Sequence, residues 1–132
     1  MIHENGHKLG VNPYLPSWEY IPDAEPHVFG DRVYIYGSHD RFNGYMYCLN
    51  DYVCWSAPVD DLREWRYEGV ILKTLEDPFN PDGDGALYAP DVCQGSDGRF
   101  YLYYVLSEDG HVFNRTYEEH KVDADKYHKS LK

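Results

Sequence analysis

The chain has 132 residues and a formal net charge of −11, from 23 Asp and Glu against 12 Lys and Arg. This length predicts one domain, or part of one, with a single sizeable hydrophobic core. The negative charge repels phosphate backbones and anionic membrane surfaces. Nucleic acid and lipid are therefore disfavoured as the main partner, and a neutral ligand is favoured.

Aromatic residues make up 17% of the chain, including 14 Tyr and 3 Trp. Aromatic side chains favour strands, and their flat amphipathic faces also stack on sugar rings. The composition therefore leaves two interpretations open, an aromatic β-core and a carbohydrate-binding surface.

The three cysteines, Cys48, Cys54 and Cys93, form no CxxC spacing. An odd count without that spacing indicates neither a disulfide framework nor a zinc site, so we expect buried free thiols. The N-terminal residues lack the apolar region of a signal peptide, and no stretch reaches a membrane-spanning length. We therefore expect a cytoplasmic protein.

Four short segments of β type come first along the chain, separated by turn signals: 26–29, 32–38, 51–58 and 65–72. The separators "GD", "FNG" and "VDDLRE" are short, as in an antiparallel meander whose consecutive strands pair with each other. The sequence therefore predicts one four-stranded antiparallel sheet.

A second unit begins near "APDVCQGSDGRFYLYYVLS". Its "DGRFYLY", at 97–103, follows the similar "GDRVYIY", at 30–36, by 67 residues. An aspartate precedes each copy at a similar distance, Asp23 before the first and Asp91 before the second. The chain therefore contains an internal repeat of carboxylate, short strand, tight turn and aromatic strand.

A repeat of roughly 40 to 70 residues with four strands per unit is typical of β-propeller blades, which pack around a central axis. We therefore predict an all-β fold, an incomplete β-propeller of about two four-stranded antiparallel blades, the second incomplete. Inner strands of a propeller line the axis, so Asp23 and Asp91 would point toward a central cavity. A turn-forming aspartate is the alternative for each.

Three stretches in combination resemble glycoside hydrolase family 43: "IPDAEPHVFGDRVYIYGSHDRFNG", "CLNDYVCWSAPVDDLREWRYEGVIL" and "LYAPDVCQGSDGRFYLYYVL". This family consists of five-bladed propellers that act on arabinose- and xylose-containing glycans. The resemblance runs from about residue 12 to residue 107. We therefore expect N-terminal blades at 1–107 and, where the resemblance ends, a divergent tail at 108–132 that is irregular or weakly helical.

The resemblance implies roles for three residues. Asp23 matches the general base, Asp91 matches the aspartate that orients the general acid and tunes its pKa, and Tyr88 matches an aromatic residue of the sugar subsite. An inverting glycosidase needs its base and its acid on opposite faces of the sugar, roughly 6.5 to 9.5 Å apart. A third carboxylate beside the acid keeps that acid protonated by like-charge repulsion.

The family's general acid is a glutamate of a later blade, which this chain does not reach. We therefore expect a truncated glycosidase, of the arabinofuranosidase or β-xylosidase type, that is inactive alone. The alternative is a non-catalytic carbohydrate-binding or vestigial β-module. Glu25 lies too close to Asp23 on one strand to replace the acid, and Glu108, Glu118 and Glu119 lie in the unmatched tail.

Three residues after the second predicted strand are expected to contact substrate: His39, Asp40 and Phe42. Loops at strand ends commonly carry binding groups. A hydrogen-bonded turn is the alternative for His39 and Asp40, and cover for the blade edge is the alternative for Phe42.

Asn80, Asp82 and Asp84 are spaced two apart before Gly85, as at the start of a calcium loop, with Asp91 at the twelfth position. The usual first Asp and last Glu are missing, so a connection between blades is favoured and no cofactor is expected.

Two blades cannot close a propeller ring, so the faces meant for neighbouring blades stay uncovered. We therefore expect self-association through these faces, besides binding of an arabinose- or xylose-containing glycan.

Overall fold

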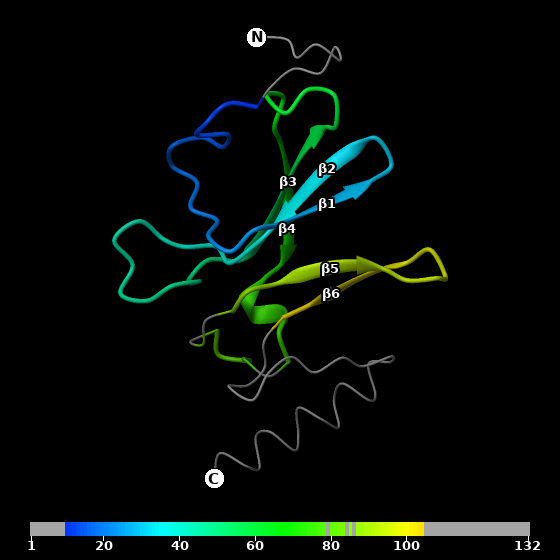
Figure 1. Cartoon of the computed structure of the whole chain (residues 1–132). Helices are drawn as coiled ribbons and strands as arrows, with labels where there is room; N and C mark the ends of the chain where they lie inside the picture. The colour runs from blue at the N-terminus through cyan, green and yellow to red at the C-terminus, as the bar shows by residue number, and fades with distance from the viewer. Residues whose placement is uncertain (1–9, 79, 84, 86, 105–132) are drawn as a thin grey trace.

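A computed structural model describes residues 10–78, 80–83, 85 and 87–104. Strands β1 (Glu25–Phe29), β2 (Arg32–Tyr36), β3 (Tyr52–Pro58) and β4 (Arg66–Leu72) form one antiparallel sheet in chain order. A short 3-10 turn, η1 (Thr74–Glu76), follows, and β5 (Asp91–Gln94) and β6 (Phe100–Tyr103) pair as an antiparallel hairpin. The predicted all-β fold, a four-stranded sheet with the start of a second unit, is confirmed (Figure 1).

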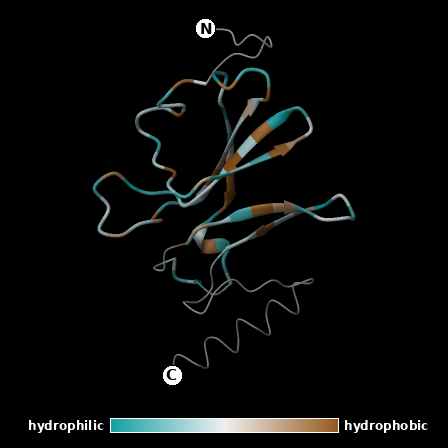
Figure 2. Cartoon of the chain, viewed as in Figure 1, coloured by the Kyte–Doolittle hydropathy of each residue, from teal (hydrophilic) through white to brown (hydrophobic). Residues whose placement is uncertain are grey.

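Alternating side chains on β2 and β3 build a core on each face of the sheet, because successive residues of a strand point to opposite sides. On one face, Ile35, Val53 and Trp55 are buried under partly buried residues of the segment before β1, including Leu15 and Ile21. Figure 2 shows hydrophobic stretches on β2 and on β5. The central strand β3 is covered on both sides, and every residue from Tyr52 to Ala57 is buried.

The β5–β6 hairpin packs on the other face of the sheet. Val92 of β5 is buried against Tyr36 and Cys54, and the rings of Phe29 and Phe100 meet edge to face with centroids 4.8 Å apart. Sheet and hairpin therefore share a core, as expected for two successive blades of an incomplete propeller.

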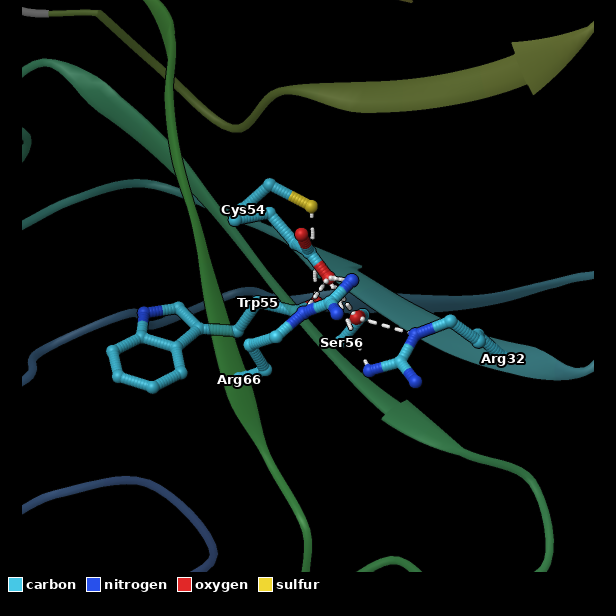
Figure 3. Close-up of polar contacts among 6 residues, drawn as sticks. Arg32, Cys54, Trp55, Ser56 and Arg66 are labelled. Atoms are coloured by element: carbon cyan, nitrogen blue, oxygen red, sulfur yellow. Dashed lines mark hydrogen bonds and ion pairs between the residues drawn. The ribbon is translucent and has the colours of Figure 1, made fainter.

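A polar network ties β2, β3 and β4 together on this same face (Figure 3). Arg32 Nε donates to Ser56 Oγ at 2.9 Å, and the Ser56 hydroxyl donates to Glu68 Oε1. Arg66 donates to the same oxygen from Nε and Nη2, at 2.9 and 2.8 Å. The Ser56 hydroxyl, and next to it Arg66, hold the pKa of Glu68 below its usual value.

The connection between β2 and β3 is longer than predicted. β2 ends at Tyr36 and β3 begins at Tyr52, so residues 37–51 form a loop, which we call the β2–β3 loop. The Asp40 carboxylate accepts the Cys48 N–H at 2.6 Å, and the Asn50 side chain donates to the Asp40 carbonyl at 2.8 Å. These contacts satisfy polar groups of the loop that strand pairing would otherwise satisfy. The expectation of a short connection between these two strands was therefore wrong.

The pairing registers correct one detail of the predicted repeat. Asp91 pairs with Tyr103, and Glu25 pairs with Tyr36. Tyr103 follows Tyr36 by the 67 residues of the repeat, so Glu25 is the register equivalent of Asp91. Asp23 lies two residues earlier, in the turn before β1.

Two of the three thiols are buried as expected, those of Cys48 and Cys54. Cys93 is exposed, because β5 turns Val92 toward the shared core and its neighbour away from it. The expectation of a buried thiol was therefore wrong for Cys93.

The divergent tail expected at 108–132 lies outside the described residues. In the part of the chain that the structure describes, no helix has the length and apolar character needed to cross a membrane.

Candidate active site

Asp23 lies in a turn that is seated directly on the end of β2. A Cβ atom on Gly37 would lie 2.7 Å from Ile21 Cγ2 and 2.8 Å from the Pro22 carbonyl oxygen. Real Cβ atoms do not approach other atoms so closely, so the turn can sit there only because residue 37 is glycine. Asp23 itself adopts a left-handed backbone conformation, with φ of 59°.

The Asp23 side chain is accessible. The residue is exposed, and among the described residues no hydrogen bond or ion pair engages its carboxylate. A carboxylate with open oxygens and solvent access is able to accept a proton from a water molecule.

Asp91 has the opposite environment, because both of its oxygens are engaged. Oδ1 accepts hydrogen bonds from His27 Nε2 at 2.5 Å and from the Val92 N–H at 2.7 Å, and Oδ2 accepts the Tyr103 hydroxyl. His27 lies on β1, so Asp91 joins the four-stranded sheet to the hairpin.

Burial by itself would raise the pKa of Asp91, but the hydrogen bonds from Tyr103, Val92 and His27 hold that pKa below its usual value. The same bond to Asp91, together with burial, raises the pKa of Tyr103 to about 12. Asp91 is therefore a stably ionised carboxylate within an interface, whereas Asp23 is an open one.

His39 was expected to contact substrate, and its ring nitrogens already have partners in the protein. Nδ1 lies 2.7 Å from the Asp51 carbonyl oxygen, and Nε2 lies 2.7 Å from Glu19 Oε1. The Trp55 indole N–H donates to the other Glu19 oxygen at 2.9 Å. His39 therefore anchors the β2–β3 loop to the segment before β1.

Asp40 also shapes the loop. Its carboxylate accepts the Cys48 N–H, and its backbone N–H donates to the Tyr20 carbonyl at 2.9 Å. This second bond holds the start of the loop beside the segment that leads to Asp23. The sequence did not indicate that Asp40 would link these two segments.

The structure places Phe42 and Tyr88 in two separate aromatic pairs. The ring of Phe42 stacks on Tyr20, with centroids 6.0 Å apart and an interplanar angle of 29°. Tyr88 lies against Tyr47, with centroids 5.3 Å apart and an angle of 54°. Sequence reasoning missed both partners; the cluster "GYMYC" in a segment between strands was the available signal for Tyr47.

Left-handed backbone conformations concentrate in the same region. The non-glycine residues with positive φ in the described part are Asp23, Asn43, Cys48 and Ala89, at 59°, 54°, 57° and 36°. They fall in the Asp23 turn, in the β2–β3 loop and between Tyr88 and Asp91. Such conformations cost energy in non-glycine residues and cluster at functional sites. Backbone geometry therefore marks the same three segments as the predicted site residues.

The third segment is tied to the other two at the end of β2. The Ala89 N–H donates to the hydroxyl of Ser38 at 3.0 Å. Ser38 is buried and directly follows Gly37. The end of β2 thus contacts the Asp23 turn on one side and the segment leading to Asp91 on the other.

The weak calcium-loop pattern gains no support from the described geometry. The Asn80 side chain closes its own loop, accepting the Gly85 N–H at 2.9 Å and donating to the Gly85 carbonyl at 2.7 Å. Asp84 lies outside the described residues. Among the residues that are described, no group of three or more His, Cys, Asp or Glu side chains could hold a metal ion.

No protein-family model matches the chain. It is 77% identical over 101 residues to a xylosidase/arabinosidase of Thermoclostridium stercorarium, which covers 76% of this chain and 21% of that protein. It is 34% identical over 102 residues to xylosidase/arabinosidase 43A of Humicola insolens, covering 71% of this chain and 30% of the relative. A xylosidase/arabinosidase of Bacteroides ovatus is 33% identical over 110 residues, covering 76% and 32%.

The chain thus spans between a fifth and a third of the length of these relatives. The matches cover most of the chain, and the all-β arrangement of a complete four-stranded sheet followed by a second hairpin agrees with the expected blades. Over the region that it shares with these relatives, the chain is similar to xylosidases/arabinosidases, which is consistent with a fragment of a glycoside hydrolase family 43 protein.

Proposed function

We propose that the chain carries the base-bearing part of an inverting glycoside hydrolase for xylose- or arabinose-containing glycans, with Asp23 as the general base. The observation that carries the proposal is the Asp23 carboxylate itself, which is exposed and has no hydrogen-bond partner among the described residues. Its turn is fixed by close packing on Gly37, which supplies the rigid placement that base catalysis requires.

In the proposed reaction, an Asp23 oxygen accepts a proton from the water molecule that attacks the anomeric carbon. The bond between that carbon and the leaving oxygen breaks, and the leaving oxygen takes a proton from a carboxylic acid on the opposite face of the sugar. The family resemblance assigns this acid to a glutamate of a later blade. We therefore expect no turnover from the 132-residue chain alone.

Asp91 is proposed to act on that acid as a fixed negative charge. Its hydrogen bonds keep it ionised, which supports the role, because an ionised neighbour raises the proton affinity of a carboxylic acid. Those bonds also join the hairpin to β1, so Asp91 is proposed to position the second blade as well.

A non-catalytic carbohydrate-binding module remains the second candidate. The two aromatic pairs favour it, since stacking on a sugar needs no general acid.

Self-association is proposed for the face of the sheet opposite the hairpin. A cavity of about 380 Å³ opens there, lined mainly by apolar residues that include Tyr14, Val33, Ile35 and Trp65. Apolar surface of this kind, beside the open edge of β1, favours association with further protein.

A chimera tests the catalytic proposal. The region of the Thermoclostridium stercorarium xylosidase/arabinosidase that matches this chain is replaced by the chain's own residues, and hydrolysis of chromogenic xylosides and arabinofuranosides is measured. We expect activity in the chimera and none after Asp23→Asn, because an amide does not accept the water's proton. Asp31→Asn, in the exposed turn between β1 and β2, is the matched control and should keep activity. An active chimera that tolerates Asp23→Asn would refute the assignment.

A further inference from the structure

Two aromatic pairs, each with one residue on the β2–β3 loop, have no role in the catalytic proposal. Tyr20 and Phe42 make one pair and Tyr47 and Tyr88 the other; we call the four the aromatic platform. Phe42 is 71% exposed and Tyr47 is 60% exposed. Tyr20 is 39% exposed and Tyr88 is partly buried, so Phe42 and Tyr47 are the two rings that leave apolar faces open to a ligand.

Hydrogen bonds connect the two arms of the loop that carries Phe42 and Tyr47. The Arg41 carbonyl accepts the Gly44 N–H at 2.8 Å, and the Arg41 side chain donates to Asn50 Oδ1 at 3.2 Å and to the Leu49 carbonyl at 3.3 Å. Together with the Asp40–Cys48 bond, these contacts fix both arms of the loop. A pre-organised surface loses little conformational entropy when a ligand binds.

Each pair lies close in sequence to one of the two proposed catalytic aspartates. Tyr20 precedes Asp23 by three residues, and Tyr88 precedes Asp91 by three residues. The Asp40–Tyr20 backbone bond and the Ala89–Ser38 bond tie both segments to the same loop. The platform therefore adjoins the segments that carry Asp23 and Asp91. Each of its two pairs includes one residue of the β2–β3 loop.

We propose that the aromatic platform binds successive sugar units of a neutral oligosaccharide, with Phe42 and Tyr47 as the main contacts. The inference rests on the proposed function for the ligand class and extends it to binding residues that sequence reasoning did not identify, Tyr20 and Tyr47. Flat rings with apolar faces match the C–H faces of sugar rings.

A neutral oligosaccharide fits better than the other occupants of an exposed aromatic surface. The net charge of −11 disfavours an anionic polymer or a membrane surface. The self-association proposed above is assigned to a different surface, the sheet face with the apolar cavity lined by Val33 and Ile35. The relatives that cover most of the chain are named xylosidase/arabinosidase.

Binding by the 132-residue chain is the test, because it needs no catalysis. Titration calorimetry is performed with short xylo-oligosaccharides, with arabino-oligosaccharides and with anionic oligogalacturonate. We expect heat of binding with at least one neutral series and none with oligogalacturonate. Phe42→Ala and Tyr47→Ala should each weaken binding about fivefold or more, and Phe42→Trp should restore it, since indole keeps the flat face.

Tyr101→Ala is the matched control, because Tyr101 is an exposed tyrosine of β6 outside the platform, and it should bind as the wild type does. Circular dichroism melts confirm that the variants fold. Absence of binding to both neutral series, or unchanged affinity in both alanine variants, would overturn the proposal. Self-association that is lost in Phe42→Ala would also overturn it, by assigning the platform to a contact between copies.

Asp23→Asn separates this proposal from the catalytic one. It should leave oligosaccharide binding by the chain unchanged, whereas the chimera should lose hydrolysis. If the Asp23→Asn chimera keeps hydrolysis while the platform variants weaken binding, only the assignment of Asp23 as the base is refuted. If hydrolysis depends on Asp23 while the platform variants leave binding unchanged, only the proposed role of the platform is refuted.

Discussion

Gly37 and Pro22 approach each other so closely that a Cβ atom on the glycine would stand 2.8 Å from the proline carbonyl oxygen. This contact joins the end of β2 to the turn that presents Asp23. The position of the proposed base therefore depends on a residue that has no side chain and no chemistry of its own.

Gly37→Ala should displace the Asp23 turn. The added methyl group meets backbone atoms as well as the Ile21 side chain, so relief requires the turn to move. We expect a loss of about 1–3 kcal/mol in the free energy of unfolding, measured by urea titration, and reduced hydrolysis in the chimera. Gly10→Ala is the control, because its Cβ would meet the nearest atom, Leu62 Cβ, at an ordinary 3.6 Å. Equal stability of the two variants would contradict the close-packing argument.

Asp23→Gly should separate stability from activity. Glycine adopts a φ of 59° without steric cost, so the free energy of unfolding should stay unchanged or rise by up to about 1 kcal/mol. Hydrolysis by the corresponding chimera should disappear, because the carboxylate is gone. Thermal melts and the chromogenic assay measure the two effects. A clear loss of stability would show that the Asp23 side chain has a structural role that its exposure does not indicate.

Asp91→Asn should weaken the attachment of the hairpin to the sheet. Hydrogen bonds to a charged group typically contribute about 1.5–3 kcal/mol, so we expect a decrease of about 1–3 kcal/mol in the free energy of unfolding. Tyr103→Phe, which removes one donor and keeps the ring, should cost less. An Asp91→Asn variant as stable as the wild type would show that the carboxylate is not what joins β5 to β1.

The stability difference at Asp91 should depend on pH. Because the pKa of Asp91 is lower in the folded chain than in the unfolded chain, its contribution is fully present above the ordinary aspartate value of about 3.9. The contribution is lost as the pH falls through the lower folded-state pKa. Unfolding curves of wild type and Asp91→Asn should therefore converge in acid. A gap that stays constant down to the lowest measurable pH would contradict this assignment.

Val28→Lys should reduce self-association. Val28 is 62% exposed on the edge strand β1 and pairs with Val33, which lines the apolar cavity. A lysine there adds charge to an apolar face and blunts an open edge. Light scattering over a concentration series should show a smaller average mass than for the wild type. Val59→Lys, at an exposed position in the turn after β3, is the control. Identical masses for Val28→Lys and wild type would place the contact elsewhere.

The sheet was predictable because its signals are local. The "GD" turn and the aromatic strands on either side of it give β1 and β2, and the repeated "DGRFYLY" gives β6. The β2–β3 loop was harder to predict because hydrogen bonds of the Asp40, Arg41 and Asn50 side chains shape it, and these act between residues 8 to 10 positions apart. Periodicity does not record such bonds.

The residues of the candidate site were likewise predictable only where the signal is local in the sequence. Motif resemblance pointed to Asp23, Tyr88 and Asp91, whereas the partner of Asp91 on β1, His27, became visible only when the hairpin packed on the sheet. The two are 64 residues apart in the chain. The packing of Gly37 against the Asp23 turn likewise depends on backbone proximity, for which the sequence offers only an unremarkable glycine at a strand end.

The burial of β3 has a consequence for the timing of ligand entry. The β2–β3 loop begins and ends on neighbouring paired strands of the sheet, and β3 is buried from Tyr52 to Ala57 with a strand hydrogen-bonded on each side. Moving the two ends of the loop apart would require those strands to separate, which is a sub-global opening and therefore rare. The base of the loop is thus fixed, so any motion that admits a sugar chain is confined to the middle of the loop and must first open the hydrogen bonds of Asp40, Arg41 and Asn50.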